Sequence, residues 1–190
     1  SDGWIERQLY TTRTGLYPAM KQTMTTKKLA QTAMLVAMAT AVHWLEGVLV
    51  PLFPGLPGVK LGLANLFTLY ALQTLGRSSA FLISVLRCGL GLLLTGAPVG
   101  TLYAFAGAML SFAVMVLMQA LRFGPLAQPV MGALAHNTAQ GLMAVLITGT
   151  SGLLYYLPIL WLAAVPTGLL IGALCLGMQK VWKGQTHDAG

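Results

Sequence analysis

The amino-acid sequence predicts an all-α membrane protein with six transmembrane helices and both termini on the cytoplasmic side. Three observations lead to this fold class. Of the 190 residues, 56% are hydrophobic and only 8% are charged, whereas a soluble domain carries about 25% charged residues. The apolar residues form long runs separated by short connections. The charged residues lie mainly at the ends of these runs, as in chains that cross a membrane repeatedly.

Six apolar segments can be read along the chain, and most reach the roughly 20 residues that a helix needs to cross a bilayer. They cover residues 29–50, 61–75, 79–95, 99–121, 126–148 and 153–181. The second and third segments are short, which favours a bend, a re-entrant stretch or a pocket lined by protein. Each connection contains glycine, and the first reads "PLFPGLPG" (51–58), as expected of turns.

The two ends of the chain are polar. Residues 1–19 contain no apolar stretch of the kind found in a signal peptide, and we expect them to be an upstream extension or a loose cytoplasmic tail. The predicted organisation is therefore an N-terminal tail over 1–27, a membrane domain over 28–182 and a C-terminal tail over 183–190.

The basic residues predict the orientation. Apart from one lysine, those near the apolar segments fall on one side of a six-span chain: Lys21, Lys27, Lys28, Arg77, Arg122, Lys180 and Lys183. The positive-inside rule makes that side cytoplasmic. The net charge of +7 then serves topology and contact with anionic membrane lipid, and it does not indicate nucleic-acid binding. Lys60 is the exception, because it lies at the outer end of the second segment.

Polar side chains inside the apolar segments are the candidate ligand-binding residues. Charged groups at this depth cost several kcal/mol and usually face a cavity or one another. We expect the following residues to converge on a chamber open to the exterior: Glu46, Lys60, Asn65, Arg87, Tyr103, His136, Asn137 and Gln140. Because the cations in this set outnumber Glu46, we predict a small anionic ligand that carries a carboxylate or a phosphate.

Each of these assignments has a structural alternative. Arg87 can form a structural pair with Glu46, and Lys60 can extend its amine to the outer headgroups. His136 and Gln140, which share a face at i, i+4 spacing, can serve helix-to-helix hydrogen bonding. Tyr155 and Tyr156 at the start of the sixth segment can also contribute to the chamber, or they can belong to an interfacial aromatic belt.

Small residues form a stripe on the first segment. Ala33, Ala37 and Ala41 recur every fourth residue, and this spacing lets another helix approach closely in lipid. The stripe predicts either the docking of a partner membrane protein or packing within the chain.

Several kinds of chemistry lack their motifs in this sequence. There is no GxxxxGK[ST] phosphate loop and no HExxH motif, so we expect no ATP hydrolysis by this chain and no bound metal or other cofactor. The four acidic residues are Asp2, Glu6, Glu46 and Asp188. Three of them lie in the tails, which rules out an aspartate-rich magnesium site. Cys88 and Cys175 are isolated in apolar segments and predict no disulfide. We therefore predict that the protein is not an enzyme.

Three strings resemble one family: "PGVKLGLANLFTLYAL" (57–72), "GALAHNTAQ" (132–140) and "YYLPILWLAAVPTGLLIGAL" (155–174). They resemble heptaprenyl diphosphate synthase component I, also called the Gx transporter family, which is similar to the substrate-binding S components of energy-coupling factor (ECF) vitamin transporters. The resemblance implies a bacterial cytoplasmic membrane protein with a binding pocket under the loop that joins its first two helices. It also implies docking through an alanine stripe, which Ala33, Ala37 and Ala41 match.

The resulting functional prediction is a membrane subunit that binds a small anionic molecule for uptake. Its partners would be the transmembrane coupling subunit and the ATPases of an ECF module. The alternative is a non-catalytic membrane subunit linked to prenyl diphosphate or quinone biosynthesis, or to an electron-transfer assembly.

Overall fold

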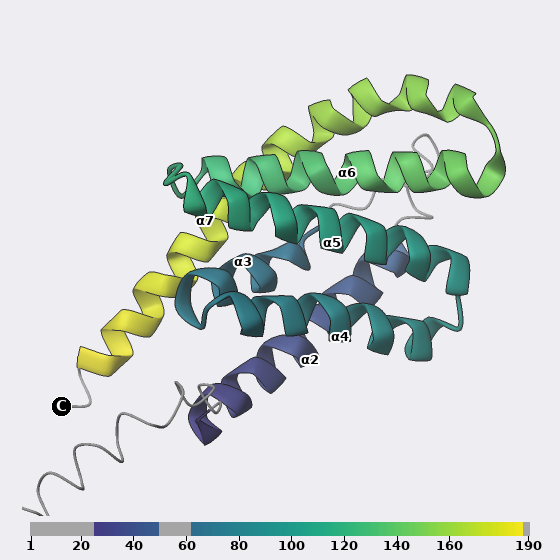
Figure 1. Ribbon diagram of the computed structural model, residues 1–190. Helices are drawn as coiled ribbons and strands as arrows, with labels where there is room; N and C mark the ends of the chain where they lie inside the picture. The colour runs from purple at the N-terminus through teal and green to yellow at the C-terminus, as the bar shows by residue number, and fades with distance from the viewer. Residues whose placement is uncertain (1–24, 50–61, 188–190) are drawn as a thin grey trace, which may run out of the picture. The chain divides into compact units, whose positions relative to one another are not determined.

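The computed structural model describes residues 25–49 and 62–187, and every regular element in these ranges is helical. This confirms the predicted all-α class. The elements are α2 (Thr26–Leu49), α3 (Asn65–Thr74), α4 (Arg77–Thr95), α5 (Pro98–Ala120), α6 (Ala127–Thr148), the short 3₁₀ helix η2 (Ser151–Tyr156) and α7 (Leu157–His187) (Figure 1). By its internal contacts the chain divides between Ala30 and Gln31, within α2. The part from Gln31 onward contains the rest of α2 and every later helix.

Four of the described helical stretches are long and apolar enough to cross a membrane. They are Arg77–Thr95, Pro98–Ala120, Ala127–Thr148 and Ser151–Val181. The second predicted segment, 61–75, forms only the ten-residue helix α3. At a rise of 1.5 Å per residue, α3 is about 15 Å long, half the roughly 30 Å of a hydrocarbon core.

The helix boundaries follow from local sequence. Pro98 opens α5, where its fixed φ suits the first turn and its missing N–H costs nothing. Gly96 after α4 and Gly149 after α6 have φ values of 61° and 68°. This left-handed conformation closes a helix at little cost only in glycine. These residues set the tight connections that return the chain across the bundle.

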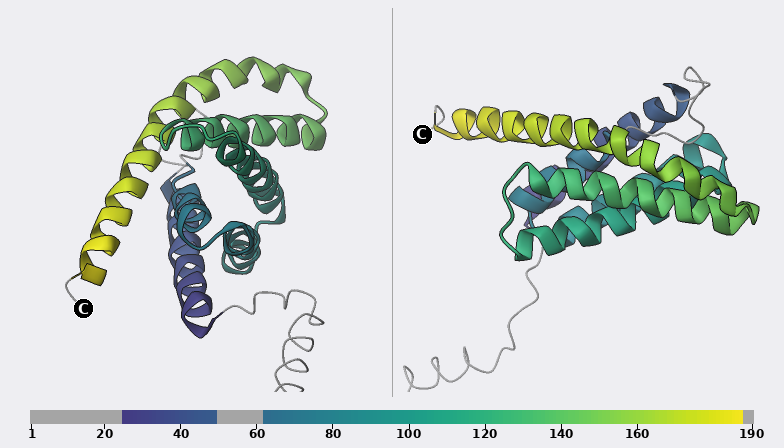
Figure 2. Two further views of the ribbon diagram at one scale, coloured as in Figure 1. Left: turned by 60° about the vertical axis from the view of Figure 1, so that its left-hand side comes forward. Right: turned by 90° about the horizontal axis from the view of Figure 1, so that it is seen from above.

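α4, α5 and α6 lie side by side in chain order, and α7 packs along α6 (Figures 1 and 2). α7 curves along its length in both figures, and Pro166 lies inside it. Proline removes a backbone hydrogen bond and bends a helix. Just beyond it, a Cβ placed on Gly168 would lie 2.6 Å from the Cα of Val130. Glycine at this position therefore lets the backbones of α6 and α7 touch.

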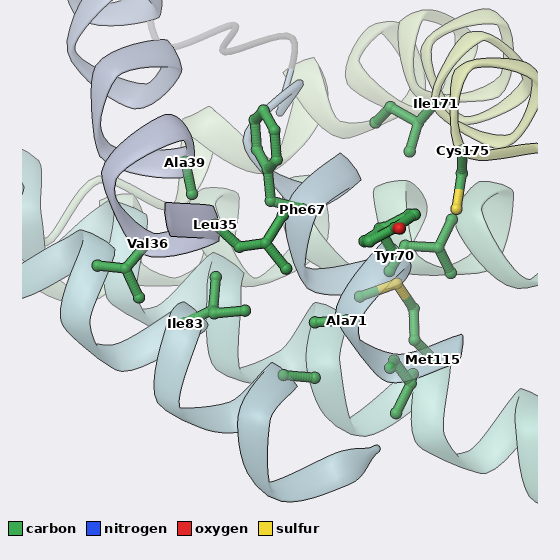
Figure 3. Packing of buried hydrophobic residues seen from close by; sticks show 13 residues of the cluster. Leu35, Val36, Ala39, Phe67, Tyr70, Ala71, Ile83, Met115, Ile171 and Cys175 are labelled. Atoms are coloured by element: carbon green, nitrogen blue, oxygen red, sulfur yellow. The ribbon is translucent and has the colours of Figure 1, made fainter. Parts of the chain in front are cut away.

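The short helix α3 lies at the centre of the apolar core. Phe67, Leu69, Tyr70, Ala71 and Leu72 are all at most 7% exposed. Figure 3 shows Phe67 on the side of α2 and Tyr70 on the side of α7, near Ile171 and Cys175. Because α2 covers one side of α3 and α7 covers another, α3 is almost completely buried.

The outer faces of the long helices are strongly apolar. Leu93, Leu146 and Leu162 are 80%, 77% and 77% exposed. Exposed apolar surface of this extent is unfavourable in water and favourable in lipid. This exposed apolar surface and the four long apolar helices are together typical of a membrane protein.

Candidate functional site

A buried polar cluster joins α3, α4 and α6. Arg87 on α4 is 2% exposed, and its Nη2 donates a 2.6 Å hydrogen bond to Oδ1 of Asn65 at the start of α3. The amide nitrogen of Asn65 lies 3.4 Å from Nδ1 of His136 on α6. Asn65 and His136 are each 4% exposed. One asparagine thus links a guanidinium on one helix to an imidazole on another.

The sequence brings these residues to one depth through equal spacing from the turns. Asn65 precedes Gly76, the residue between α3 and α4, by eleven residues, and Arg87 follows it by eleven. His136 lies twelve residues after Gly124 in the α5–α6 connection. Both connections lie at the end of the bundle that carries Arg77 and Arg122. Because each residue is eleven or twelve positions from its connection, the three side chains lie at a similar distance from that end of the bundle.

Glycines on neighbouring helices make room for the imidazole rings. A Cβ placed on Gly107 of α5 would lie 2.7 Å from Cε1 of His136. In the same way, a Cβ on Gly91 of α4 would lie 2.9 Å from Cδ2 of His43 on α2. Gly107 was not among the residues predicted from the sequence. In the sequence, Gly107 appears only as a glycine between two alanines in an apolar segment. Many positions in helix contacts have this pattern, so it does not point to a site.

Glu46 closes the cluster from α2. It is 5% exposed, and its Oε1 accepts a hydrogen bond from the backbone N–H of Leu63. Leu63 lies in the turn that leads into α3, where the Gly62 φ is 68° and the Asn65 N–H bonds to the Gly62 carbonyl. The Glu46 carboxylate therefore holds the start of α3, and its charge also acts on Arg87.

Arg87 retains a spare hydrogen-bond donor. Its Nε has no hydrogen-bond partner among the described residues, although the side chain is buried. A guanidinium presents five N–H donors in a planar fork that matches the two oxygens of a carboxylate or a phosphate. A buried polar group without a partner costs about 1–3 kcal/mol, so a ligand acceptor that reached this edge would recover that free energy.

The other predicted ligand residues lie in different places. Tyr103 is half-buried on α5, one turn before Gly107 and on the same face. Gln140 is buried one turn after His136. Asn137 is buried, but its amide donates to the Leu160 carbonyl in the contact between α6 and α7. Lys60 lies outside the described residues, as do the "PLFPGLPG" connection (51–58) and the residues 1–19.

The predicted alanine stripe lies on the exposed face of α2. Ala33, Ala37 and Ala41 are all exposed, whereas Leu35 and Ala39 are buried against the core. Met34 and Met38 on the same exposed face are 50% and 42% exposed. The stripe therefore does not pack within residues 31–48 and 62–181, whose side chains the structure describes.

The described residues contain no group of three or more His, Cys, Asp or Glu side chains that could hold a metal ion. Glu46, Asn65, Arg87 and His136, which are all buried, offer hydrogen bonds and charge. One positive and one negative formal charge lie among them, together with an imidazole.

Comparison with known proteins identifies a family. The heptaprenyl diphosphate synthase component I family matches residues 35–178, a range that includes Glu46, Asn65, Arg87 and His136. No curated protein and no solved structure matches the chain. The matched range covers well over half of the sequence and agrees with the resemblance of its three strings. The chain therefore belongs to the heptaprenyl diphosphate synthase component I family.

Proposed function

We propose that this protein is a non-catalytic membrane subunit that binds a small anionic molecule beside Arg87. The observation that carries this proposal is the buried guanidinium of Arg87, whose Nε has no hydrogen-bond partner among the described residues. An ionisable residue within a membrane helix is expensive and usually serves a function. Asn65 accepts a hydrogen bond from Nη2, which lies on the same edge of the guanidinium as Nε. A carboxylate or phosphate that pairs with this edge through two oxygens would therefore compete with Asn65 for Nη2.

We further propose that the protein works as an S component does, delivering its ligand through a partner that docks on α2. The exposed alanines at positions 33, 37 and 41 support this, because small residues let a helix of another subunit approach closely. The partner would be the transmembrane coupling subunit of an ECF module, and that module's ATPases would supply the energy. In this reading the protein lies in the bacterial cytoplasmic membrane with both termini inside.

One observation favours a second candidate function. The family name describes a component of a prenyl diphosphate synthase. A non-catalytic subunit could hold the anionic end of an isoprenoid near Arg87 while a separate catalytic subunit performs the synthesis. The four acidic residues of the chain include no aspartate-rich set that would hold magnesium.

Ligand-induced thermal stabilisation tests the binding site. The purified protein in detergent is heated with pairs of compounds that differ only in charge, each a carboxylate and the corresponding primary amide. We expect the midpoint of unfolding to rise with carboxylates and not with amides. Arg87→Gln keeps an N–H donor but removes the charge, so it should abolish the rise. Arg122→Gln, at an exposed helix end, should retain it. If carboxylates raise the midpoint of unfolding no more than the corresponding amides do, the proposal is refuted.

Copurification separates the two candidate functions. Under the transport reading, ECF-type ATPases and the coupling subunit copurify with the protein and are lost on Ala37→Leu, because the leucine fills the docking stripe. Met38→Leu on the same exposed face conserves volume and should leave the complex intact. Copurification with a soluble prenyl diphosphate synthase that is insensitive to Ala37→Leu would instead favour the accessory reading.

A further inference from the structure

Helix α3 carries a polar side chain at each end. Asn65 at its start belongs to the Arg87 site, and Gln73 near its end lies eight residues away, which is about 12 Å along the helix axis. Between them α3 is almost completely buried. The helix therefore runs from the proposed ligand site to a second polar cluster nearer the Arg77 end of the bundle.

Four glutamines make up this second cluster. The amide nitrogen of Gln179 on α7 donates to Oε1 of Gln73 at 2.5 Å, and that of Gln73 donates to Oε1 of Gln128 on α6 at 2.9 Å. Gln128 in turn donates to the Met115 carbonyl of α5 at 2.9 Å. Gln119 of α5 donates to the carbonyl of Leu72 on α3. Every glutamine nitrogen in the cluster donates a hydrogen bond, so α3 is held to three other helices.

These bonds fix the position of α3 along its own axis. In lipid the hydrophobic effect gives little force between helices, so interhelical hydrogen bonds and close packing determine their register. Apolar contacts in the core, such as those of Leu69 and Ala71, are non-directional and do not select one exact register. The hydrogen bonds of Gln73 at one end and of Asn65 at the other are directional, because a hydrogen bond weakens steeply when its geometry is lost.

We propose that α3 couples the two clusters mechanically, with Gln73 as a positioning residue for the site at Asn65. An anionic ligand at Arg87 competes with Oδ1 of Asn65 for the guanidinium. Release of Asn65 removes one of the hydrogen bonds that hold the start of α3, and the resulting shift of the helix loosens the bonds of Gln73 to Gln128 and Gln179. Site occupancy is thereby transmitted to the C-terminal part of α7. This inference rests on the proposed function.

A cysteine already present in the glutamine cluster reports its state. Cys175 on α7 is 1% exposed, and its sulfur lies 3.5 Å from Oε1 of Gln73. In a Cys88→Ala background, Cys175 is the one remaining cysteine of the chain, and its rate of alkylation by N-ethylmaleimide measures how often the cluster opens. The measurement uses the full-length protein in detergent and needs no knowledge of the ligand.

Asn65→Ala should raise the alkylation rate of Cys175 about fivefold, the equivalent of one lost buried hydrogen bond. Asn65→Asp should stay near the parent rate, because its carboxylate still accepts from Arg87. Asn137→Ala is the matched control: it removes a buried amide that bonds to α7 at Leu160 but does not touch α3. Asn65→Ser replaces the alanine variant if that variant does not give monodisperse protein.

Two outcomes would overturn the inference. In the first, Cys175 of the Asn65→Ala variant is alkylated at the parent rate, which means that the loss of the Asn65 hydrogen bond does not change the glutamine cluster. In the second, Asn137→Ala accelerates labelling as much as Asn65→Ala, which means that any loss of packing opens α7. Neither outcome affects the test with carboxylates and amides, so a failure of the coupling and a failure of the binding proposal can be told apart.

Discussion

Nη2 of Arg87 lies 2.6 Å from Oδ1 of Asn65, and this hydrogen bond joins α4 to α3 inside the membrane bundle. The two residues stand eleven positions on either side of Gly76, so the α3–α4 hairpin itself aligns them. Asn65 also lies beside His136, and Glu46 holds the turn that precedes it. The start of α3 is thus the point at which α2, α4 and α6 meet.

Loss of the guanidinium should destabilise the protein. Arg87→Ala leaves the Asn65 carbonyl without its donor and removes the cation near Glu46. We expect the free energy of unfolding to fall by about 2 kcal/mol or more, measured by titration with sodium dodecyl sulfate. Arg77→Ala, at an exposed helix start, should change it by less than about 0.5 kcal/mol. Equal effects of the two substitutions would contradict a role for Arg87 in holding α3.

A methyl group at Gly107 should displace His136. The added Cβ would lie 2.7 Å from the ring, and overpacking of this kind costs about 1–3 kcal/mol. Gly89→Ala on α4 is the control, because nothing lies within 4 Å of its Cβ position, and we expect no loss of stability. Thermal unfolding in detergent measures both variants. A Gly107→Ala protein as stable as Gly89→Ala would show that His136 is not confined there.

Gly168→Ala should be more harmful than Gly107→Ala. Its Cβ would lie 2.6 Å from the Cα of Val130 and 3.0 Å from the Pro129 carbonyl oxygen, and a backbone cannot move aside as a side chain can. We expect the midpoint of thermal unfolding to fall further than for Gly107→Ala. Gly177→Ala in the same helix has open space around it and should not lower the midpoint. The reverse order would mean that α6 and α7 separate at little cost.

Arg122→Gly should stabilise the protein. Arg122 follows α5 with a φ of 58°, a left-handed conformation that costs a non-glycine residue about 1–2 kcal/mol. Glycine adopts it without strain, so the midpoint of unfolding should rise. Arg122→Ala removes the same charge but keeps the strain, and it should give no rise. An equal gain in both variants would attribute the effect to charge.

The long helices were predictable because hydropathy and turn residues mark them directly. The predicted segment 126–148 became α6, which begins one residue later and ends at the same residue, Thr148. α3 begins four residues after the start of its predicted segment 61–75, because Gly62 and the turn up to Asn65 precede the first helical residue. Hydropathy cannot detect this turn, since Leu61 and Leu63 are as apolar as the helix that follows. α7 continues past 181 to His187 because polar residues can extend a helix beyond the apolar core.

The buried polar residues of the site were also predictable, but their partners were not. Arg87, Asn65 and His136 stand out in the sequence as polar groups within apolar runs, and the structure brings them together. The role of Glu46 at the Leu63 N–H depends on backbone geometry that no residue pattern shows. The glutamine cluster was missed because Gln73, Gln128 and Gln179 each lie near a segment end, where a polar residue is ordinary.

Native mass spectrometry of the gently purified protein tests the central claim most directly. We expect the wild-type protein to carry a bound small molecule that is identified as an anion after release. Arg122→Gln should retain it, and Arg87→Gln should lose it. A wild-type protein that carries only lipid, or an Arg87→Gln variant that keeps the same bound species, would contradict the claim that Arg87 forms an anion-binding site.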